Sequence, residues 1–238
     1  MNKMKYFPTL IAGIMLLAGL GTASAQKNEF IPLETWPYVY EFFCPGDITN
    51  FKGEVTHLEL LNVCVHDGKI HFVKNNVIMA ADPINVSSLS IGDETYMNIR
   101  GKMMRQLKAG EHSKVLRSIG INQAERDKVQ VGYGESSLAS TQSIGSVSLA
   151  GSDLPPYTLN KNISEKDKYD GRELPLLEDL YIWVDGLLFR AARNELLNAP
   201  ELDKEAVKDL IKKYKPRFTD PESLAGFAEG LHGAIITE

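Results

Sequence analysis

The hydrophobic residues of this chain follow two different periods, and this change limits the folds open to it. From Tyr38 to about Ser118 apolar and polar residues alternate, which is the pattern of half-buried β-strands. Near the C terminus Val207, Leu210 and Ile211 recur at helical spacing instead. The two periods predict an α+β fold, in which an N-terminal antiparallel β domain precedes a β-hairpin and a short C-terminal helical module.

The clearest predicted strand pair lies within residues 61–73, on either side of Asp67-Gly68. Asp-Gly between alternating apolar residues is a strong signal for a hairpin with a two-residue turn. In that register Val65 pairs with Ile70, and Cys64 pairs with His71. We expect one face of the pair in the core (Val63, Val65, Ile70 and Phe72) and four residues on the other face (Cys64, His66, Lys69 and His71).

Further strands are expected at 86–91, 95–99, 103–107 and 114–119, and a last pair at 180–184 and 187–189 around Asp185-Gly186. Three helices follow, at about 192–198, between Asp203 and Pro216, and after Thr219. Asp203 is the expected N-cap of the second, and Thr219 with Glu222 has the spacing of a capping box. Because neither longer helix buries its apolar stripe alone, we expect them to pack on each other and on the last hairpin.

Residues 1–25 have the pattern of a secretory signal peptide. Lys3 and Lys5 precede an uncharged apolar run at 10–20, and Ala23-Ser24-Ala25 provides small residues for cleavage before Gln26. The run is shorter than the roughly 20 residues that a membrane-spanning helix needs. We therefore expect an exported protein, periplasmic or extracellular, without a membrane span.

Three segments are expected after the signal peptide. Residues 26–130 are predicted to form the β-rich domain, and residues 180–238 the hairpin and helical module. Residues 131–179 are predicted to be a Ser- and Gly-rich tract and linker, because small polar residues bury little apolar area to offset chain entropy.

The charge balance limits the class of partner. The chain has 26 Lys and Arg residues against 31 Asp and Glu residues, a net charge of -5. Non-specific nucleic-acid binding depends on Lys and Arg contacts with phosphates. We therefore expect no nucleic-acid partner.

The chain has two cysteines, Cys44 and Cys64, and two interpretations of their role are open. In an exported protein they can form a disulfide, with two buried thiols as the alternative. Cys64, His66 and His71 share one predicted face, and thiolate and imidazole are ligands of zinc and copper. A metal site at Cys64, His66 and His71 is thus a second interpretation, although the spacing matches no established metal motif and Lys69 on that face would repel a cation.

No catalytic or cofactor-binding residue is predicted. The segment 132–134, Gly-Tyr-Gly, lacks the third Gly of a dinucleotide-binding loop and the Lys of a P-loop. We expect the carboxylates of Glu173, Glu178 and Asp179 to be solvated. His112 and His232 fall in a predicted turn and near the C terminus, where single histidines seldom have a function. These observations favour a protein without catalytic activity.

Several patches of the chain resemble a family of secreted proteins from Bacteroidetes-type bacteria. The N-terminal patches are residues 53–55, 67–72, 91–96 and 106–110, and a polar tract at 132–148 follows them. The C-terminal patches are a strand with an Asp-Gly turn at 184–186 and helical segments at 194–200, 205–216 and 221–231. The family is uncharacterised and has no assigned catalytic residues, so the resemblance implies an envelope protein and no active site. The cysteines and histidines of this chain depart from the family pattern.

The residues and the resemblance lead to one expected function. We expect an exported, non-catalytic cell-envelope protein that binds another protein or a surface glycan and uses no cofactor. Sheet edges and the helical module are the expected docking surfaces. The alternative is a metal-binding or redox protein that uses Cys64, His66 and His71.

Overall fold

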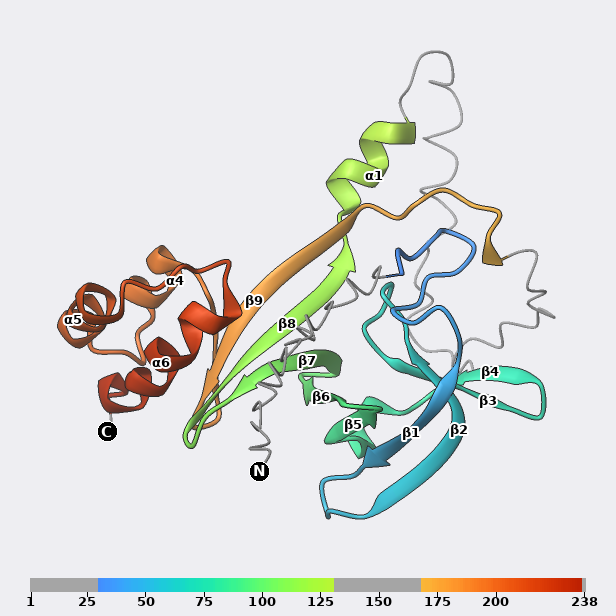
Figure 1. Ribbon diagram of the computed structural model, residues 1–238, viewed down its shortest axis with the longest axis horizontal. Helices are drawn as coiled ribbons and strands as arrows, with labels where there is room; N and C mark the ends of the chain where they lie inside the picture. Colours follow the sequence, from blue (N-terminus) through green and yellow to red (C-terminus); the bar gives the residue numbers. More distant parts are fainter. Residues whose placement is uncertain (1–29, 131–167, 237–238) are drawn as a thin grey trace, which may run out of the picture.

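The computed structural model describes residues 30–130 and 168–236. A ten-stranded antiparallel sheet runs through both parts, and short helices gather near the C terminus (Figure 1). The α+β fold predicted from the two hydrophobic periods is confirmed. The predicted signal peptide, residues 1–25, and residues 131–167 of the predicted polar tract lie outside the described residues.

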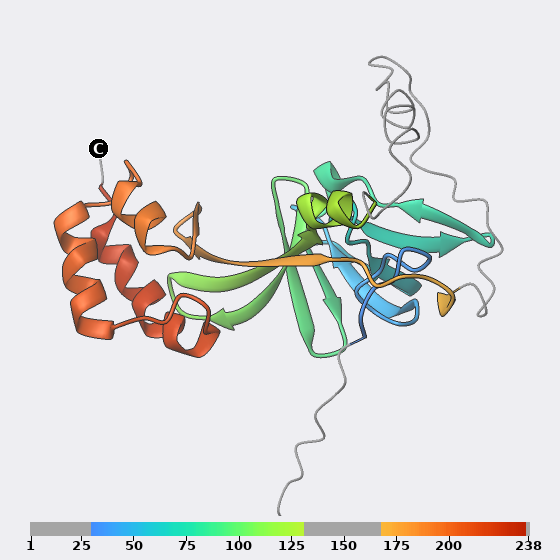
Figure 2. The ribbon, with the colours of Figure 1, turned by 90° about the horizontal axis from the view of Figure 1, so that it is seen from above.

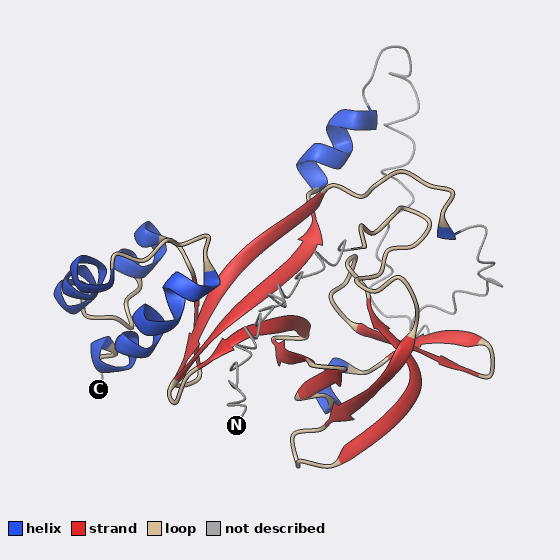
Figure 3. Cartoon of the chain, viewed as in Figure 1, coloured by secondary structure: helices blue, strands red, loops and turns tan. Residues whose placement is uncertain are grey.

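The strands are β1 (Cys44–Thr49), β2 (Val55–Val63), β3 (Ile70–Lys74), β4 (Val77–Ala80), β5 (Ser88–Ile91), β6 (Glu94–Ile99), β7 (Lys102–Ala109), β8 (Ser113–Ile121), β9 (Leu176–Val184) and β10 (Leu187–Arg190). The helices are α1 (Gln123–Gln130), α4 (Arg193–Asn198), α5 (Lys204–Tyr214) and α6 (Pro221–Leu231), with 3-10 turns η1 (Pro83–Asn85) and η2 (His232–Ala234) (Figure 3). Helix α1 is not predicted from the sequence. Among the described residues, no helix has both the length and the apolar character needed to cross a membrane.

The sheet is a meander with one interruption. Its strand order is β10-β9-β8-β7-β6-β5-β1-β2-β3-β4, so β1 lies between β2 and β5. Strand β9 pairs with β8 along its whole length, from Ser113 opposite Val184 to Ile121 opposite Leu176. The hairpin β9–β10 therefore extends the N-terminal sheet, and β9 includes residues 176–179, which the sequence analysis assigns to the linker.

Apolar residues form separate cores toward the two ends of this sheet. Helices α4, α5 and α6 gather at one end, and strands β1–β5 form the other end (Figures 1 and 2). Leu224, Phe227 and Leu231 of α6 are fully buried against the face of β8 and β9 that carries Val115 and Ile182. The predicted packing of the helices on the hairpin is confirmed. A second cluster around Leu61, Leu89 and Tyr96 fills the other end.

The two longer helices begin at aspartates. The Asp203 side chain accepts hydrogen bonds from the Glu205 and Ala206 backbone N–H groups, so the predicted N-cap of α5 is confirmed. The predicted capping box at Thr219 is wrong, because Asp220 is the N-cap of α6 and accepts from the Glu222 N–H. The proline at position 221 supplies the first helical residue, and the carboxylate directly before it satisfies one of the free N–H groups of the first turn.

The register predicted for the hairpin around Asp67-Gly68 is wrong. Strand β2 ends at Val63, which pairs with Ile70, whereas the prediction pairs Val65 with Ile70. His71 therefore lies opposite Asn62 and not opposite Cys64.

The N-terminal segment causes this shift. Tyr38 forms a β-bridge with Cys64, and the Val65 N–H donates to the Pro37 carbonyl at 3.0 Å. The backbone at 64–65 thus pairs with residues 37–38, and the chain returns to β3 through a longer loop. Trp36, Tyr38 and Cys64 form a small buried cluster. The predicted core positions 63, 65 and 70 are buried and 72 is half-buried, but Cys64 and His71, expected on the opposite face, are buried as well.

Candidate functional site

The structure brings together two of the three predicted metal ligands. The ligand atoms of Cys64 and His71 lie within 4.8 Å of each other, and Asp67 is the third member of the group. His66 is exposed and does not belong to it. Asp67 replaces His66 because the longer loop turns its side chain back toward β3, where its carboxylate also accepts a hydrogen bond from the Lys69 N–H.

Hydrogen bonds within this cluster already engage both ring nitrogens of His71. The Tyr38 hydroxyl lies 3.1 Å from Nδ1, and the Asp67 carboxylate lies 3.3 Å from Nε2. Burial, together with the charge of Asp67, raises the pKa of the Cys64 thiol to about 11. A metal ion here would have to displace a hydrogen-bond partner of His71 and a proton of Cys64. The metal site at Cys64, His66 and His71 stays a prediction, and the contacts favour a closed polar cluster that supports the buried Tyr38.

The charge of Asp67 contributes to this closed arrangement. Burial acts to raise the pKa of Asp67, but the hydrogen bonds from His71 and from the Lys69 backbone outweigh burial and hold the pKa below its usual range. Partial desolvation of the His66 ring and the charge of the nearby Arg126 lower the pKa of His66. The carboxylate is therefore ionised at neutral pH, and His66 is uncharged there.

Both cysteines are free thiols in the structure. Cys64 belongs to the cluster around Trp36 and Tyr38, whereas Cys44 packs against the cluster around Leu61. The Cys44 thiol lies 3.9 Å from the Leu61 carbonyl oxygen. Cys64 is buried and Cys44 is half-buried, and the disulfide between Cys44 and Cys64 stays a prediction.

Two of the three predicted solvated carboxylates form ion pairs with arginines. Glu178 lies 3.4 Å from a terminal nitrogen of Arg117, and Asp179 lies 2.6 Å from a terminal nitrogen of Arg190. Glu173 is exposed. These pairs connect the outer part of β9 to its neighbours on both sides, β8 and β10.

The ion pairs line a groove of about 660 Å³ between the sheet and the helical module. Its apolar lining includes Leu107, Leu180, Phe218 and Pro221, and its positive lining is Arg117, Arg190 and Arg193. The groove lies where α4 follows β10 directly and α6 packs on β7 and β8. Guanidinium groups recognise carboxylates through paired, charge-assisted hydrogen bonds, so the groove is suited to an acidic ligand with apolar parts.

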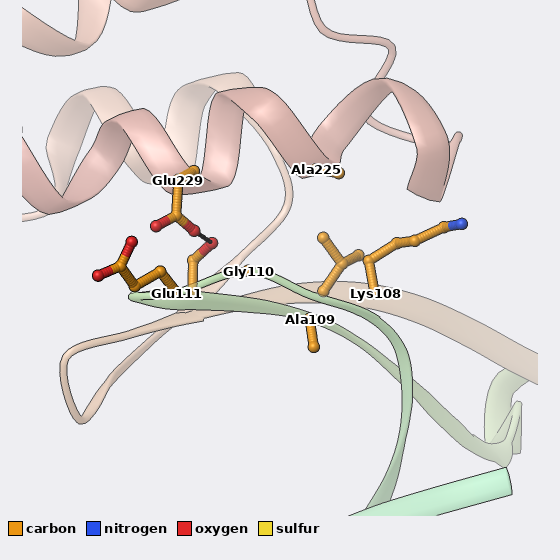
Figure 4. Close-up of a pocket in the computed structure, with 8 residues that line it drawn as sticks. Lys108, Ala109, Gly110, Glu111, Ala225 and Glu229 are labelled. Carbon is orange, nitrogen blue, oxygen red and sulfur yellow. Dashed lines mark hydrogen bonds between the residues drawn. The ribbon is translucent and has the colours of Figure 1, made fainter.

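A smaller cavity of about 240 Å³ lies between the β7–β8 loop and α6. Glu229 reaches from α6 toward this loop, with Glu111 nearby and Lys108 at the far side (Figure 4). The Glu229 carboxylate accepts hydrogen bonds from the His112 N–H at 2.9 Å and from the Ser113 hydroxyl at 2.8 Å. These bonds, that of Ser113 first, lower the pKa of Glu229. The hydrogen bonds of Glu229 therefore hold the β7–β8 loop against α6 beside this cavity.

The same loop brings together residues that the sequence analysis sets aside. The rings of His112 and His232 stack with centroids 4.0 Å apart and planes inclined by 12°, and Asp185 contacts His232. Positions 112, 185 and 232 become neighbours only through the long-range pairing of β8 with β9 and the packing of α6 on them. No local sequence signal points to this group, because each residue alone has the context of an ordinary turn or helix end.

Comparison of the chain with models of protein families, with curated proteins and with solved structures finds no match. The resemblance to secreted Bacteroidetes-type proteins stays a prediction.

Proposed function

We propose that this chain is an exported, non-catalytic cell-envelope protein that binds an acidic segment of another envelope protein. The groove between the sheet and the helical module is the proposed binding site. The observation that supports it is that three arginines and several apolar side chains line the same groove of about 660 Å³. Ligand sites in proteins have volumes of about 300–1,000 Å³ and combine apolar walls with a few polar groups.

The charges of the groove favour a carboxylate ligand. Arg117 and Arg190 are balanced by Glu178 and Asp179, and Arg193 at the start of α4 adds a further positive charge. The Arg190 side chain is half-exposed, and both of its hydrogen bonds to Asp179 go to one carboxylate oxygen. A guanidinium has five N–H donors, so Arg190 can also bind a carboxylate of the partner.

The apolar lining favours a polypeptide over a glycan. Successive side chains of an extended peptide point to opposite sides, so one segment can place apolar groups on Phe218 and Leu180 and acidic groups on the arginines. A surface glycan is the second outcome that the experiment has to distinguish.

Site-specific photo-cross-linking in the native cell envelope tests the proposal. A photoreactive residue is placed at the exposed groove position Thr219, and a control is placed at Lys52, which is exposed in the β1–β2 loop. We expect Thr219, and not Lys52, to cross-link to one protein, identified by mass spectrometry of the joined peptides. An adduct at Thr219 whose added mass is removed by glycosidase would support the glycan instead.

Charge reversal supplies the matched control. Arg193→Glu is expected to abolish the cross-link from Thr219, whereas Arg172→Glu, at an exposed arginine paired with Glu34, is expected to leave it unchanged. Equal cross-linking from Thr219 and Lys52, or equal loss with both reversals, would place the binding surface elsewhere.

The export proposal has a separate test. The mass of the protein recovered from the periplasm or the medium is expected to match a chain that begins at Gln26. Recovery of only the full-length chain in the cytoplasm would contradict export.

A further inference from the structure

Three different elements bring His112, Asp185 and His232 to one point at the end of the sheet. His112 lies in the β7–β8 loop, Asp185 in the β9–β10 turn, and His232 directly after α6. One ligand atom of each residue lies within 4.8 Å of those of the other two. The group is distant in sequence from the proposed ligands at Cys64 and His71, and its residues do not line the arginine groove.

Backbone hydrogen bonds fix the positions of all three residues. The Asp185 N–H donates to the His112 carbonyl at 3.4 Å, and the His112 N–H donates to Glu229 of α6 at 2.9 Å. The His232 N–H caps α6 by donating to the Glu229 and Gly230 carbonyls. The loop, the turn and the helix end are therefore tied to one another before any ligand binds, which reduces the ordering that binding requires.

The side chains themselves stay accessible. Their exposed fractions are 42% for His112, 38% for Asp185 and 49% for His232. An ion can reach them from solvent, and water can complete its coordination. The Glu111 carboxylate lies 3.8 Å from Nε2 of His112 and adds negative charge beside the group.

The ion pair between His232 and Asp185 does not account for the position of the His112 ring beside it. The ring of His112 stacks on that of His232 with centroids 4.0 Å apart, so two imidazoles and one carboxylate lie together at this point. A metal cation bound by both rings uses neutral imidazoles. Two imidazoles and one carboxylate are a ligand set that zinc, copper and iron accept in proteins.

We propose that His112, Asp185 and His232 bind one divalent transition metal ion, with Zn²⁺ as the probe. Zinc bonds to nitrogen and oxygen are about 2.0–2.2 Å long, so the ligand atoms of a tetrahedral site stand roughly 3.3–3.5 Å apart. Side-chain rotation at these exposed positions closes the remaining distance. The bound ion connects the β7–β8 loop, the β9–β10 turn and the end of α6.

Calorimetric titration of the tag-free mature chain with Zn²⁺ tests this site. We expect one ion per chain, with affinity reduced at least about tenfold in each of His112→Ala, Asp185→Asn and His232→Ala. Titration with Co²⁺ is expected to give a visible spectrum without a thiolate charge-transfer band, since the proposed ligands are nitrogen and oxygen. Circular dichroism of each variant verifies that it is folded.

Two control variants separate this site from the other candidates. His57→Ala removes an exposed histidine that pairs with Asp47 and Glu59 but has no second histidine beside it, and it is expected to bind Zn²⁺ like the parent chain. Cys64→Ser is also expected to leave Zn²⁺ binding unchanged. No Zn²⁺ binding by the parent chain, unchanged binding in folded His112→Ala and His232→Ala variants, or loss only with Cys64→Ser would each overturn the proposal.

Discussion

The Ser113 hydroxyl donates a hydrogen bond to the carboxylate of Glu229, which lies 116 positions further along the chain. The same carboxylate accepts from the His112 backbone, so α6 is tied to the start of β8. Hydrogen bonds to charged groups contribute about 1.5–3 kcal/mol, and the partial exposure of Glu229 reduces this value. We expect Glu229→Ala to lower the free energy of unfolding by about 1 kcal/mol, measured by urea denaturation.

Glu222 on the same helix is the control for this prediction. It forms an exposed ion pair with Lys108, and exposed pairs contribute less than about 1 kcal/mol. Glu222→Ala is expected to change the free energy of unfolding by no more than about 0.5 kcal/mol. Equal effects of the two substitutions would show that the tie between Glu229 and the loop adds nothing specific.

The N-terminus of α6 permits a direct test of which residue is the cap. Asp220→Ala removes the acceptor for the Glu222 N–H and is expected to cost about 1 kcal/mol of unfolding free energy. Thr219→Ala is expected to be close to neutral, because Thr219 is exposed and outside the cap. Denaturation of the two variants side by side checks this order, and a larger loss with Thr219→Ala would restore the capping box.

The two thiols are expected to react slowly in the folded protein. Burial raises the pKa of Cys44, and the pKa of Cys64 is raised to about 11 from an ordinary value of 9.0. The thiolate fraction of Cys64 at neutral pH is therefore about 100-fold smaller than that of an exposed cysteine, and its rate of reaction falls with it.

A thiol-specific chromogenic reagent measures both the number of free thiols and the rate at which they react. In denaturant we expect two reactive thiols per chain, and in buffer slow reaction that accelerates on unfolding. Cys44→Ser and Cys64→Ser assign the two phases. A count of zero thiols under denaturing, non-reducing conditions would instead demonstrate the disulfide between Cys44 and Cys64.

The pair of His57 and Asp47 on adjacent strands predicts a pH dependence. The hydrogen bond from the His57 ring to Asp47, 2.7 Å long, raises the pKa of His57 above its ordinary value of 6.5. Because the folded-state pKa is the higher one, this contribution to stability is complete below pH 6.5 and is lost as the pH rises through the folded-state value.

Proton NMR titration of the His57 ring is expected to show a midpoint above 6.5, which Asp47→Asn returns toward that value. The stability difference between the parent chain and His57→Ala is expected to shrink as the pH rises through that midpoint. A midpoint at or below 6.5 in the parent chain would contradict the pair.

Features set by neighbouring residues were predicted well from the sequence. Asp185-Gly186 forms the predicted two-residue turn between β9 and β10, with Asp185 and Gly186 both at positive φ. Asp203 caps α5 as its position before the apolar stripe predicts. In these cases the local backbone requirement and the tertiary structure agree, so local chemistry is sufficient.

The failures arise where a distant segment competes with local pairing. Asp67-Gly68 has the same turn signal as Asp185-Gly186, but Tyr38 and its neighbours pair with the backbone at 64–65 and prevent the short turn. The pairing of His112 with His232 depends on strands and a helix that meet only in the folded chain. A pattern within one window of sequence contains no information about such partners.

The ladder between β8 and β9 also determines how this sheet responds to changes in chain length. A slip of one residue between β8 and β9 turns every side chain of the strand to the opposite face and moves Ile182 and Val184 out of the core. The core beneath α6 therefore depends on the exact length of both strands, because one residue inserted into or removed from either strand exchanges its buried and exposed faces.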